Sequence, residues 1–291
     1  DFNLPLAGYL RKKGVKTVHY VSPTVWAWRQ GRIRKIRRDV ELMLTLLPFE
    51  ADFYRRFDMP VQFVGHPFAS VIEMNIDQQR AKRYWDYLPD DKVIAVLPGS
   101  RSGELKHMGP LFIETMKRLY NREPRCRFIV ALASDERRIQ FSEMLNAVDF
   151  ELPIKLVNGH AREVMAGADV VLATSGTITL EAMLLKRPMV AAYRWGRLTH
   201  AILSPLVNVK YIALPNLLAD EPLVPEFLQE KATVENLVAA LYELIHDRDR
   251  RNQIQSQFKL LHEALNCNAS ESAAEAVLKL LGCQNANVEG Q

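Results

Sequence analysis

Residues 169–181 read DVVLATSGTITLE: a short apolar run, a Ser-Gly turn, and a helix that carries a carboxylate near its start. A buried strand that ends in such a turn directs the first backbone N–H groups of the following helix towards an anion. Thr177 and Glu181 are four residues apart, so they share one helical face. The pattern predicts a diphosphate on the turn and a ribose diol on Glu181. A plain strand-turn-helix connection with a solvated Glu is the alternative interpretation.

A second apolar run, residues 93–101 (VIAVLPGSR), also ends in a glycine turn and has Arg101 at its tip. Two such units can meet at the carboxyl edge of one parallel sheet, where backbone donors and an arginine fork converge on one diphosphate. A solvated loop arginine is again the alternative. Pro110 suits the first position of a helix, so the next helix is expected to begin near residue 109.

The composition is that of a folded globular chain. Of its 291 residues, 48% are hydrophobic and 25% are charged, and the length suggests about two domains. No apolar run approaches the roughly 20 residues that span a bilayer. The three cysteines have no metal-ligand spacing, and their odd number argues against a disulfide framework and suits a reducing cytoplasm. No paired-histidine motif is present, so no structural metal is predicted. No cofactor is predicted either.

Apolar runs and helical periodicities alternate along the chain. Strands are expected at 16–21, 42–46, 61–64, 93–97, 127–133, 154–157, 169–173, 189–193 and 211–214, with helical segments between them. This alternation predicts an α/β fold with doubly wound parallel sheets. From 234 to 281 the periodicity is helical almost throughout.

A cationic segment follows two tryptophans near the start of the chain. Trp26 and Trp28 precede six Arg and Lys residues between 29 and 38, with no acidic residue before Asp39. Aromatic side chains beside a basic helix are found in nucleic-acid-binding proteins and at anionic membrane surfaces. A solvated helix face is the third interpretation, and the pattern alone favours it.

Seven short motifs resemble those of the lipid-A-disaccharide synthases. They are residues 18–29 (VHYVSPTVWAWR), 47–50 (LPFE), 63–66 (FVGH), 97–101 (LPGSR), 173–177 (ATSGT), 181–183 (EAM) and 211–219 (YIALPNLLA). The first and the last are the most specific, because other glycosyltransferases with two Rossmann-like domains carry similar glycine loops. The resemblance extends from residue 1 to about residue 281.

The resemblance implies an inverting GT-B glycosyltransferase, in which two Rossmann-like domains with parallel sheets face each other. UDP-2,3-diacylglucosamine would donate its sugar to 2,3-diacylglucosamine 1-phosphate, giving lipid A disaccharide 1-phosphate and UDP in the lipopolysaccharide biosynthesis of a Gram-negative bacterium. We expect an incomplete acceptor-side domain at 1–72, a nucleotide-sugar-binding domain at 73–250 and C-terminal helices at 251–291. These helices would pack back on the first domain or on a partner subunit of a homodimer.

The resemblance also assigns the donor site to the second domain. Arg101 would stabilise the leaving diphosphate, the Ser-Gly-Thr turn would donate hydrogen bonds to it, and Glu181 would bind the ribose. The residues expected to bind the nucleotide sugar are Gly99, Ser100, Arg101, Ser175, Gly176, Thr177, Glu181, Tyr193, Asn216 and Gln229. No metal is required in this scheme, because arginine and backbone dipoles can stabilise the leaving group.

The family's candidate general base is an Asp that precedes the segment matching Asp1-Phe2-Asn3. The chain is therefore expected to be truncated at its N-terminus and to lack the general base. On its own it is expected to have no transferase activity. His19, His66 and Glu104 are the groups to consider if this expectation fails. The acceptor or membrane side is expected to include Ser22, Trp26, Trp28, Arg29 and His66.

Lipid-linked sugar substrates imply peripheral attachment to the cytoplasmic face of the inner membrane, and no nucleic-acid partner. Two other functions remain open. A UDP-sugar 2-epimerase, or another GT-B enzyme with a soluble substrate, would share the nucleotide loops but would not need the Trp-Ala-Trp-Arg stretch. A non-catalytic basic module would bind nucleic acid through residues 29–38 with a steep salt dependence.

Overall fold

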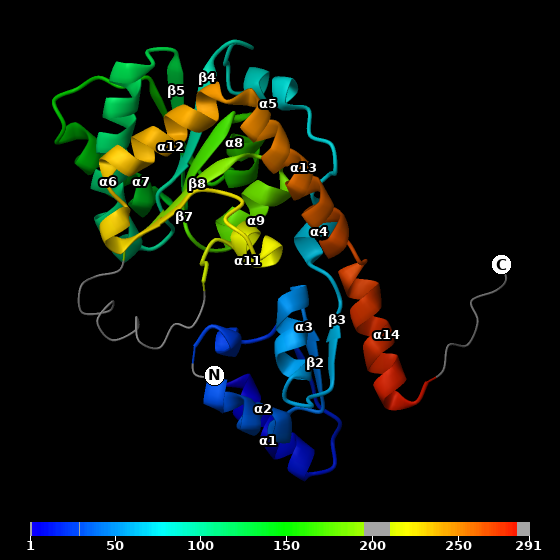
Figure 1. Ribbon diagram of the computed structural model, residues 1–291. Helices are drawn as coiled ribbons and strands as arrows, with labels where there is room; N and C mark the ends of the chain where they lie inside the picture. The colour runs from blue at the N-terminus through cyan, green and yellow to red at the C-terminus, as the bar shows by residue number, and fades with distance from the viewer. Residues whose placement is uncertain (1, 29, 195–209, 284–291) are drawn as a thin grey trace. The chain divides into compact units, whose positions relative to one another are not determined.

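The computed structural model describes residues 2–28, 30–194 and 210–283, which form two compact α/β units (Figure 1). Of these residues, the first unit contains those up to 72 together with 263–283, and the second contains 73–194 and 210–262. The chain enters the second unit after Ile72 and leaves it inside a helix, after His262. The second unit therefore extends twelve residues beyond the boundary expected at 250.

The first unit is built on a three-stranded parallel sheet in the order β1-β2-β3. The strands are β1 (Val18–Tyr20), β2 (Leu42–Thr45) and β3 (Val61–Phe63). The helices are α1 (Asn3–Lys12), α2 (Ile33–Asp39), α3 (Pro48–Arg55) and α4 (Pro67–Val71), with short 3-10 turns η1 (Thr24–Trp26) and η2 (Gln30–Arg32).

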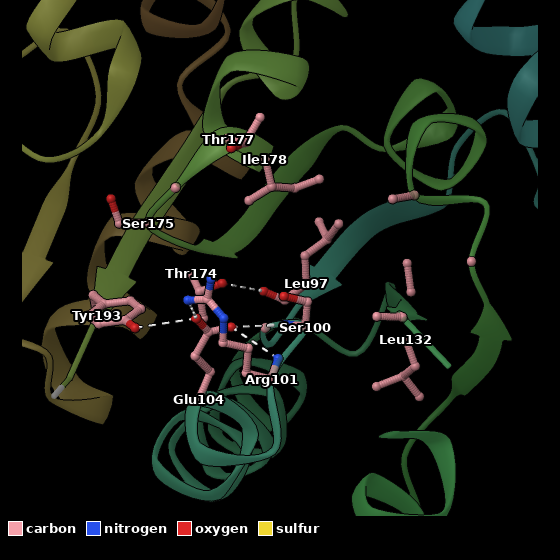
Figure 2. A pocket seen from close by; sticks show the side chains of 16 residues that line it. Leu97, Ser100, Arg101, Glu104, Leu132, Thr174, Ser175, Thr177, Ile178 and Tyr193 are labelled. Carbon is pink, nitrogen blue, oxygen red and sulfur yellow. Dashed lines mark hydrogen bonds and ion pairs between the residues drawn. The ribbon is translucent and has the colours of Figure 1, made fainter. Parts of the chain in front are cut away.

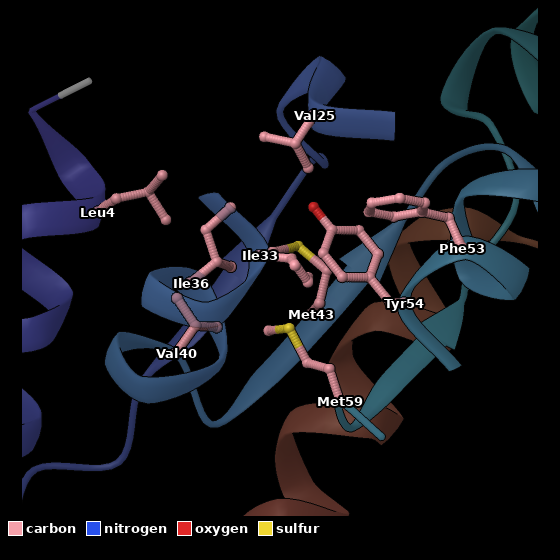
Figure 3. Close-up of a cluster of buried hydrophobic side chains, with 9 residues drawn as sticks. All are labelled: Leu4, Val25, Ile33, Ile36, Val40, Met43, Phe53, Tyr54 and Met59. Atoms are coloured by element: carbon pink, nitrogen blue, oxygen red, sulfur yellow. The ribbon is translucent and has the colours of Figure 1, made fainter. Parts of the chain in front are cut away.

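Successive residues of β2 belong to two separate hydrophobic cores, because side chains alternate between the faces of a strand. Met43 packs with residues of α1, α2 and α3 in the cluster of Figure 3, formed by Leu4, Val25, Ile33, Ile36, Val40, Met43, Phe53, Tyr54 and Met59. Leu44 packs on the other face with Val64 and with Ala276 of α14 (Ala269–Leu281). The last described helix therefore packs back on the first unit.

The second unit contains a six-stranded parallel sheet in the order β6-β5-β4-β7-β8-β9. The strands are β4 (Lys92–Leu97), β5 (Cys126–Leu132), β6 (Ile154–Asn158), β7 (Val170–Thr174), β8 (Met189–Tyr193) and β9 (Glu226–Leu228). The helices are α5 (Gln78–Tyr84), α6 (Ser102–Arg122), α7 (Asp135–Asn146), α8 (Ala161–Gly167), α9 (Thr177–Leu184), α11 (Leu214–Ala219), α12 (Val234–His246) and α13 (Arg248–Leu265), and η4 (Gln229–Lys231) is a 3-10 turn. Every residue of β7 is buried, as its continuous apolar run predicts for a central parallel strand.

Helices cover both faces of this sheet. The strands run outwards from β4 to β6 in one direction and from β7 to β9 in the other, so right-handed crossovers place α6 and α7 on one face and α8 and α9 on the other. In agreement, α6 packs against α7 and α12, and α8 packs against α5 and α9. The strand order reverses between β4 and β7, and ligands of such folds bind beside the carboxyl ends of the strands at that point.

The parallel α/β architecture predicted from the sequence is confirmed, but the strand expected at 211–214 is wrong. Leu214 begins α11, and Pro215 lies in the first turn of that helix, where its missing N–H costs nothing. The sheet ends instead with β9, whose three half-buried residues are too few to form an apolar run in the sequence.

The helix expected to begin near residue 109 begins at Ser102, and Pro110 lies inside it. The Glu104 carboxylate accepts hydrogen bonds from the backbone N–H groups of Ser100 and Arg101. This cap satisfies donors at the helix start, and so begins the helix before the proline.

A buried ion pair joins α5 to the amino edge of the six-stranded sheet. Lys82 Nζ lies 2.8 Å from Asp169 Oδ2, and the lysine side chain is only 3% exposed. The same carboxylate accepts hydrogen bonds from the Val93 backbone N–H (2.8 Å) and from the Gln78 side-chain amide (3.1 Å). Asp169, immediately before β7, therefore holds both α5 and the start of β4.

Asp169→Asn should destabilise the protein more than Lys82→Met does. The first change leaves a buried ammonium without its counter-charge, at a cost of about 3–5 kcal/mol. The second leaves a carboxylate that is 25% exposed and retains its hydrogen bonds to Val93 and Gln78. Guanidinium unfolding of both variants measures the difference, and a larger loss for Lys82→Met would contradict the prediction.

Candidate functional site

A cavity of about 400 Å³ lies at the carboxyl edge of the six-stranded sheet (Figure 2). Leu97, Leu132, Thr174 and Tyr193 line it, and each is the last residue of its strand, β4, β5, β7 and β8 respectively. The cavity therefore lies where the strand order reverses, which is the position that the topology predicts for a ligand.

The Ser-Gly-Thr turn after β7 forms one wall of this cavity. Gly176 has φ +144°, a conformation that side-chain-bearing residues rarely adopt, and it lets the chain turn directly into α9 at Thr177. The Ser175 hydroxyl is buried without a hydrogen-bond partner. The N–H groups in the first turn of a helix have no acceptor within that helix. The turn thus provides a hydroxyl and a helix N-terminus, as the sequence predicts.

The Pro-Gly-Ser-Arg loop after β4 forms the facing wall, and Glu104 holds it in place. Glu104 Oε2 accepts hydrogen bonds from the backbone N–H groups of Ser100 (3.0 Å) and Arg101 (3.2 Å). Glu104 Oε1 lies 3.2 Å from Arg101 Nη1 and accepts a hydrogen bond from the Tyr193 hydroxyl at 3.4 Å (Figure 2). A Cβ at Gly99 would lie 2.7 Å from Glu104 Cβ, so only glycine allows this close approach.

Glu104 differs sharply in exposure from the arginine that it holds. The Glu104 side chain is 15% exposed and the Arg101 side chain is 83% exposed. The guanidinium is thus tethered at one nitrogen while most of its donors face solvent beside the cavity. Burial, together with the neighbouring Glu104 carboxylate, raises the pKa of Tyr193, so this hydroxyl remains a proton donor at neutral pH.

Glu104 lines the cavity, although the sequence named it only as an alternative general base and not as a donor-site residue. Its one signal was the spacing from Arg101, the third position after an N-cap, at which Glu caps a helix start. The predicted Gly99, Ser100, Arg101, Ser175, Gly176, Thr177 and Tyr193 all line the same cavity.

Glu181 lies one turn further along α9 and is not among the residues that line the cavity. Its carboxylate forms an ion pair with Arg162 of α8. Because α8 and α9 pack against each other, this pair fixes the orientation of the carboxylate on the helix that begins at Thr177.

Asn216 and Gln229 line a different cavity, of about 680 Å³, near α11 and β9. The Asn216 side chain is 1% exposed, donates to the Val224 carbonyl (3.0 Å) and accepts from the Val224 N–H (2.9 Å). It also donates to Glu226, whose pKa is raised by burial. The structure therefore gives Asn216 a role in cross-linking the segment before β9, and brings neither residue to the cavity with Arg101.

The residues expected on the acceptor side lie in the first unit, and several bond to its own framework. Ser22 Oγ lies 3.0 Å from the Tyr54 hydroxyl, and Trp28 Nε1 donates to Thr24 Oγ1 at 3.1 Å. His66 Nδ1 accepts from the Phe68 N–H at 3.1 Å and caps α4. Burial lowers the pKa of His66 to about 4. Arg29 and Asp1 lie outside the described residues.

Trp26 is fixed by a buried carboxylate. Its Nε1 donates to Glu50 Oε1 at 3.1 Å, and Glu50 Oε2 accepts from the Leu47 backbone N–H at 3.2 Å. Burial raises the pKa of Glu50 to about 7, although these hydrogen bonds oppose the rise. The basic segment that follows is amphipathic, because α2 buries Ile33 and Ile36. Within the described ranges, no three His, Cys, Asp or Glu side chains are grouped to hold a metal ion, and no helix there is long and apolar enough to cross a bilayer.

Comparison with known proteins gives a consistent result. The family model described as lipid-A-disaccharide synthetase matches residues 1–277. Lipid-A-disaccharide synthase 2 of Legionella pneumophila (strain Lens) is 49% identical over 286 residues, covering 98% of this chain and 74% of the relative. Lipid-A-disaccharide synthase of Cellvibrio japonicus is 49% identical over 282 residues, covering 97% of this chain and 73% of the relative.

Two solved structures share the fold at low sequence identity. UDP-GlcNAc 2-epimerase from Neisseria meningitidis, bound to UDP-GlcNAc, has a TM-score of 0.62 and 15% identity, covering 94% of this chain and 71% of its own. WaaG, a glycosyltransferase involved in lipopolysaccharide biosynthesis, has a TM-score of 0.54 and 13% identity, covering 94% of this chain and 80% of its own.

Glu50→Gln should change how stability depends on pH. In the folded chain Glu50 keeps its proton up to about pH 7, whereas its ordinary pKa is 4.5. Stability from this group is therefore complete below pH 4.5 and is lost as the pH rises towards 7, by about 3 kcal/mol in all. Relative to the unaltered chain, Glu50→Gln should gain about that much unfolding free energy between about pH 5 and 8.

Denaturant unfolding across this pH range measures the difference between the two proteins. The lowered pKa of His66 acts in the opposite sense below pH 6.5, but it acts equally in both. Parallel stability profiles would show that Glu50 is ionised in the folded chain.

Proposed function

The chain belongs to the lipid-A-disaccharide synthase family, and is thus a GT-B glycosyltransferase of lipid A biosynthesis; we propose that the cavity at the carboxyl edge of the six-stranded sheet binds its UDP-sugar donor. The transfer joins the diacylglucosamine of the UDP-sugar to diacylglucosamine 1-phosphate and releases UDP. The observation that supports the proposed donor site is the convergence of an exposed arginine with a helix N-terminus and an unpartnered hydroxyl in one cavity.

The diphosphate would lie between the two loops. Ser175 Oγ and the first N–H groups of α9 would donate to one phosphate, and the guanidinium of Arg101 would contact the other with its forked donors. Cleavage of the sugar–phosphate bond places additional negative charge on the leaving oxygen, and fixed donors stabilise that charge as it develops. Arg101 is therefore proposed as the catalytic residue for leaving-group stabilisation.

Glu104 is proposed to act through Arg101 and not on the reacting atoms. Its two oxygens already bond to the amides of Ser100 and Arg101, the Arg101 guanidinium and the Tyr193 hydroxyl. These contacts fix the loop before the donor binds, which reduces the entropic cost of orienting Arg101.

Uridine would occupy the rest of the cavity. Leu132, Ala161 and Ile178 give that part an apolar lining, which suits a flat base. Glu181 would accept hydrogen bonds from the ribose hydroxyls, with Arg162 holding its carboxylate. A pKa of about 4 makes His66 a weak base, so we do not propose it for the acceptor hydroxyl.

The family relationship separates this activity from its two alternatives. Identity near 50% over 97% of the chain links it to lipid-A-disaccharide synthases, whereas the likeness to the 2-epimerase at 15% identity concerns the fold alone. The buried Ile33 and Ile36 support a surface helix at residues 33–39, so the basic segment does not require a nucleic-acid partner.

We also propose that the protein works at the cytoplasmic surface of the inner membrane, because both substrates carry acyl chains. The first unit exposes Phe2, Tyr9 and Tyr20 together with the cationic residues of α2. Aromatic and cationic side chains favour contact with an anionic lipid surface. Homodimer formation through the C-terminal helices is an additional proposal. Its support is that α13 is amphipathic and 18 residues long.

Arg101→Ala should weaken UDP binding by about 1.5–3 kcal/mol, the range for losing hydrogen bonds to a charged group. Calorimetry of the whole chain with UDP measures the change. Arg83→Ala, at an exposed position on α5, is the matched control and should bind UDP normally. Equal affinities for Arg101→Ala and the control would remove Arg101 from the donor site.

Glu181→Gln should separate recognition of the ribose from recognition of the diphosphate. Affinity for UDP should fall, because the charged acceptor of the ribose hydroxyls is lost, while affinity for pyrophosphate should stay the same. Glu163→Gln, on the exposed surface of α8, controls for a general change in charge. Equal losses for both ligands would mean that Glu181 acts through the structure of α8 and α9.

A further inference from the structure

A third cavity, of about 510 Å³, lies at the opposite edge of the same sheet. Residues 74–78, residues 185–187 and one side of α13 enclose it. Arg187 precedes β8, and Gln78 donates to the carbonyl of Ala168, just before β7. The proposed donor cavity lies beyond the last residues of these strands, so a five-residue strand, or roughly 16 Å, separates the two.

The lining of this amino-edge cavity is cationic. It includes Lys186, Arg187 and Lys259, and no carboxylate is among the described residues that line it. Neutral hydrogen-bonding groups from Asn75, Gln78, Asn252, Gln255 and Ser256 complete the polar lining. A concave surface with cations, amides and a hydroxyl but no acid suits an oxyanion.

Arg187 is the buried cation of this lining. It is 4% exposed, and its Nε has no hydrogen-bond partner. Burial lowers its pKa to about 10, so the guanidinium is still charged at neutral pH. Burying a charged donor without a partner is costly, and proteins usually compensate it with a counter-ion or a hydrogen-bond acceptor.

The carboxylate that interacts electrostatically with Arg187, that of Asp169, is already engaged by other groups. It pairs with Lys82 at 2.8 Å and accepts from the Val93 N–H and the Gln78 amide. One carboxylate therefore faces two buried cations, Lys82 and Arg187. Of these three buried or half-buried charges two are positive and one is negative, and a bound anion would restore the balance.

Lys186 occupies a position that usually belongs to glycine. It follows the last turn of α9 with φ +57°, and its N–H bonds to the Met183 carbonyl in a helix-ending turn. Its Nζ donates to the Glu73 carbonyl at 3.1 Å and lies 2.6 Å from His262 Nδ1. The long side chain thus ties the two ends of the cavity wall, residue 73 and α13, to the turn that carries Arg187.

We propose that the amino-edge cavity binds a phosphate group, either as inorganic phosphate or as a phosphomonoester headgroup, with Arg187 as the buried donor and Lys259 at the exposed rim. The planar fork of Arg187 meets two phosphate oxygens at once, and Lys259 supplies a second positive charge from α13. This site is distinct from the proposed donor cavity and does not depend on it.

The test is a calorimetric titration of the whole chain with inorganic phosphate at constant ionic strength and with saturating UDP. Phosphate should bind with an affinity in about the millimolar range, and Arg187→Lys should weaken it about tenfold, as expected for a lost charged hydrogen bond. Lys259→Gln, an exposed change that cannot disturb the core, should weaken binding about threefold. Lys279→Gln on α14 is the matched surface control and should bind normally.

Several outcomes would overturn the proposal. One is the absence of phosphate binding up to about 50 mM, a concentration well above the dissociation constants of specific sites. Another is an identical affinity for phosphate in Lys259→Gln and Lys279→Gln. Phosphate binding that is seen only without UDP, or that is lost in Arg101→Ala, would place the anion in the donor cavity instead. Since Arg101→Ala leaves the amino edge untouched, unchanged phosphate binding by that variant supports two separate sites.

Vesicles then distinguish the two sources of the phosphate group. The chain is sedimented with phosphatidylcholine vesicles with or without about one fifth phosphatidic acid, a content at which basic patches bind anionic lipid. Sedimentation that requires phosphatidic acid and falls in Lys259→Gln but not in Lys279→Gln identifies a lipid headgroup. Phosphate binding in the titration without such sedimentation identifies a soluble ligand.

Discussion

The Asp169 carboxylate is the constraint on which the second unit depends. It lies immediately before β7 and bonds to Lys82 and Gln78 of α5 and to the first buried amide of β4. It thereby fixes the register of the two strands between which the sheet order reverses. A slip of one residue would turn every side chain of a strand to the opposite face. The two loops at the far ends of β4 and β7 could then no longer meet around one ligand.

The two edges of the six-stranded sheet therefore have different roles. At the amino edge, the buried Lys82–Asp169 pair and the hydrogen bonds to Asp169 hold α5 and β4 to the start of β7. At the carboxyl edge, the strands end in turns whose N–H and hydroxyl groups remain available, and Arg101 is largely exposed. The bonded amino edge therefore holds the strands in place for the carboxyl edge, where donors are available. This is a general reason why ligands of parallel sheets bind beside the carboxyl ends of the strands.

The parts of this fold that were predictable from the sequence are local. The run at 169–173 and the turn at 175–177 each contain the information for their own conformation, because burial selects the apolar strand and glycine permits the turn. The sequence named Glu104 only as an alternative general base, since its role in holding the loop arises only when its side chain reaches back to the preceding loop. The motif at residues 211–219 predicts that Asn216 binds the nucleotide sugar. In the structure its side-chain amide instead forms hydrogen bonds with the backbone of Val224, eight residues later. No periodicity in the sequence reports such a contact, and the same is true of the Arg162–Glu181 pair.

Charge balance in the proposed donor cavity also bears on turnover. Among the described residues that line it, Arg101 and Glu104 carry charge, and their formal charges cancel. A diphosphate would then be held mainly by directed N–H and hydroxyl dipoles, with one tethered guanidinium. Additional cations would bind substrate and product UDP more tightly by the same amount, and such uniform binding does not accelerate the chemical step. Arg101, held at one nitrogen, contributes most when charge develops on the leaving oxygen, and the balanced charge of the described lining favours the later dissociation of UDP.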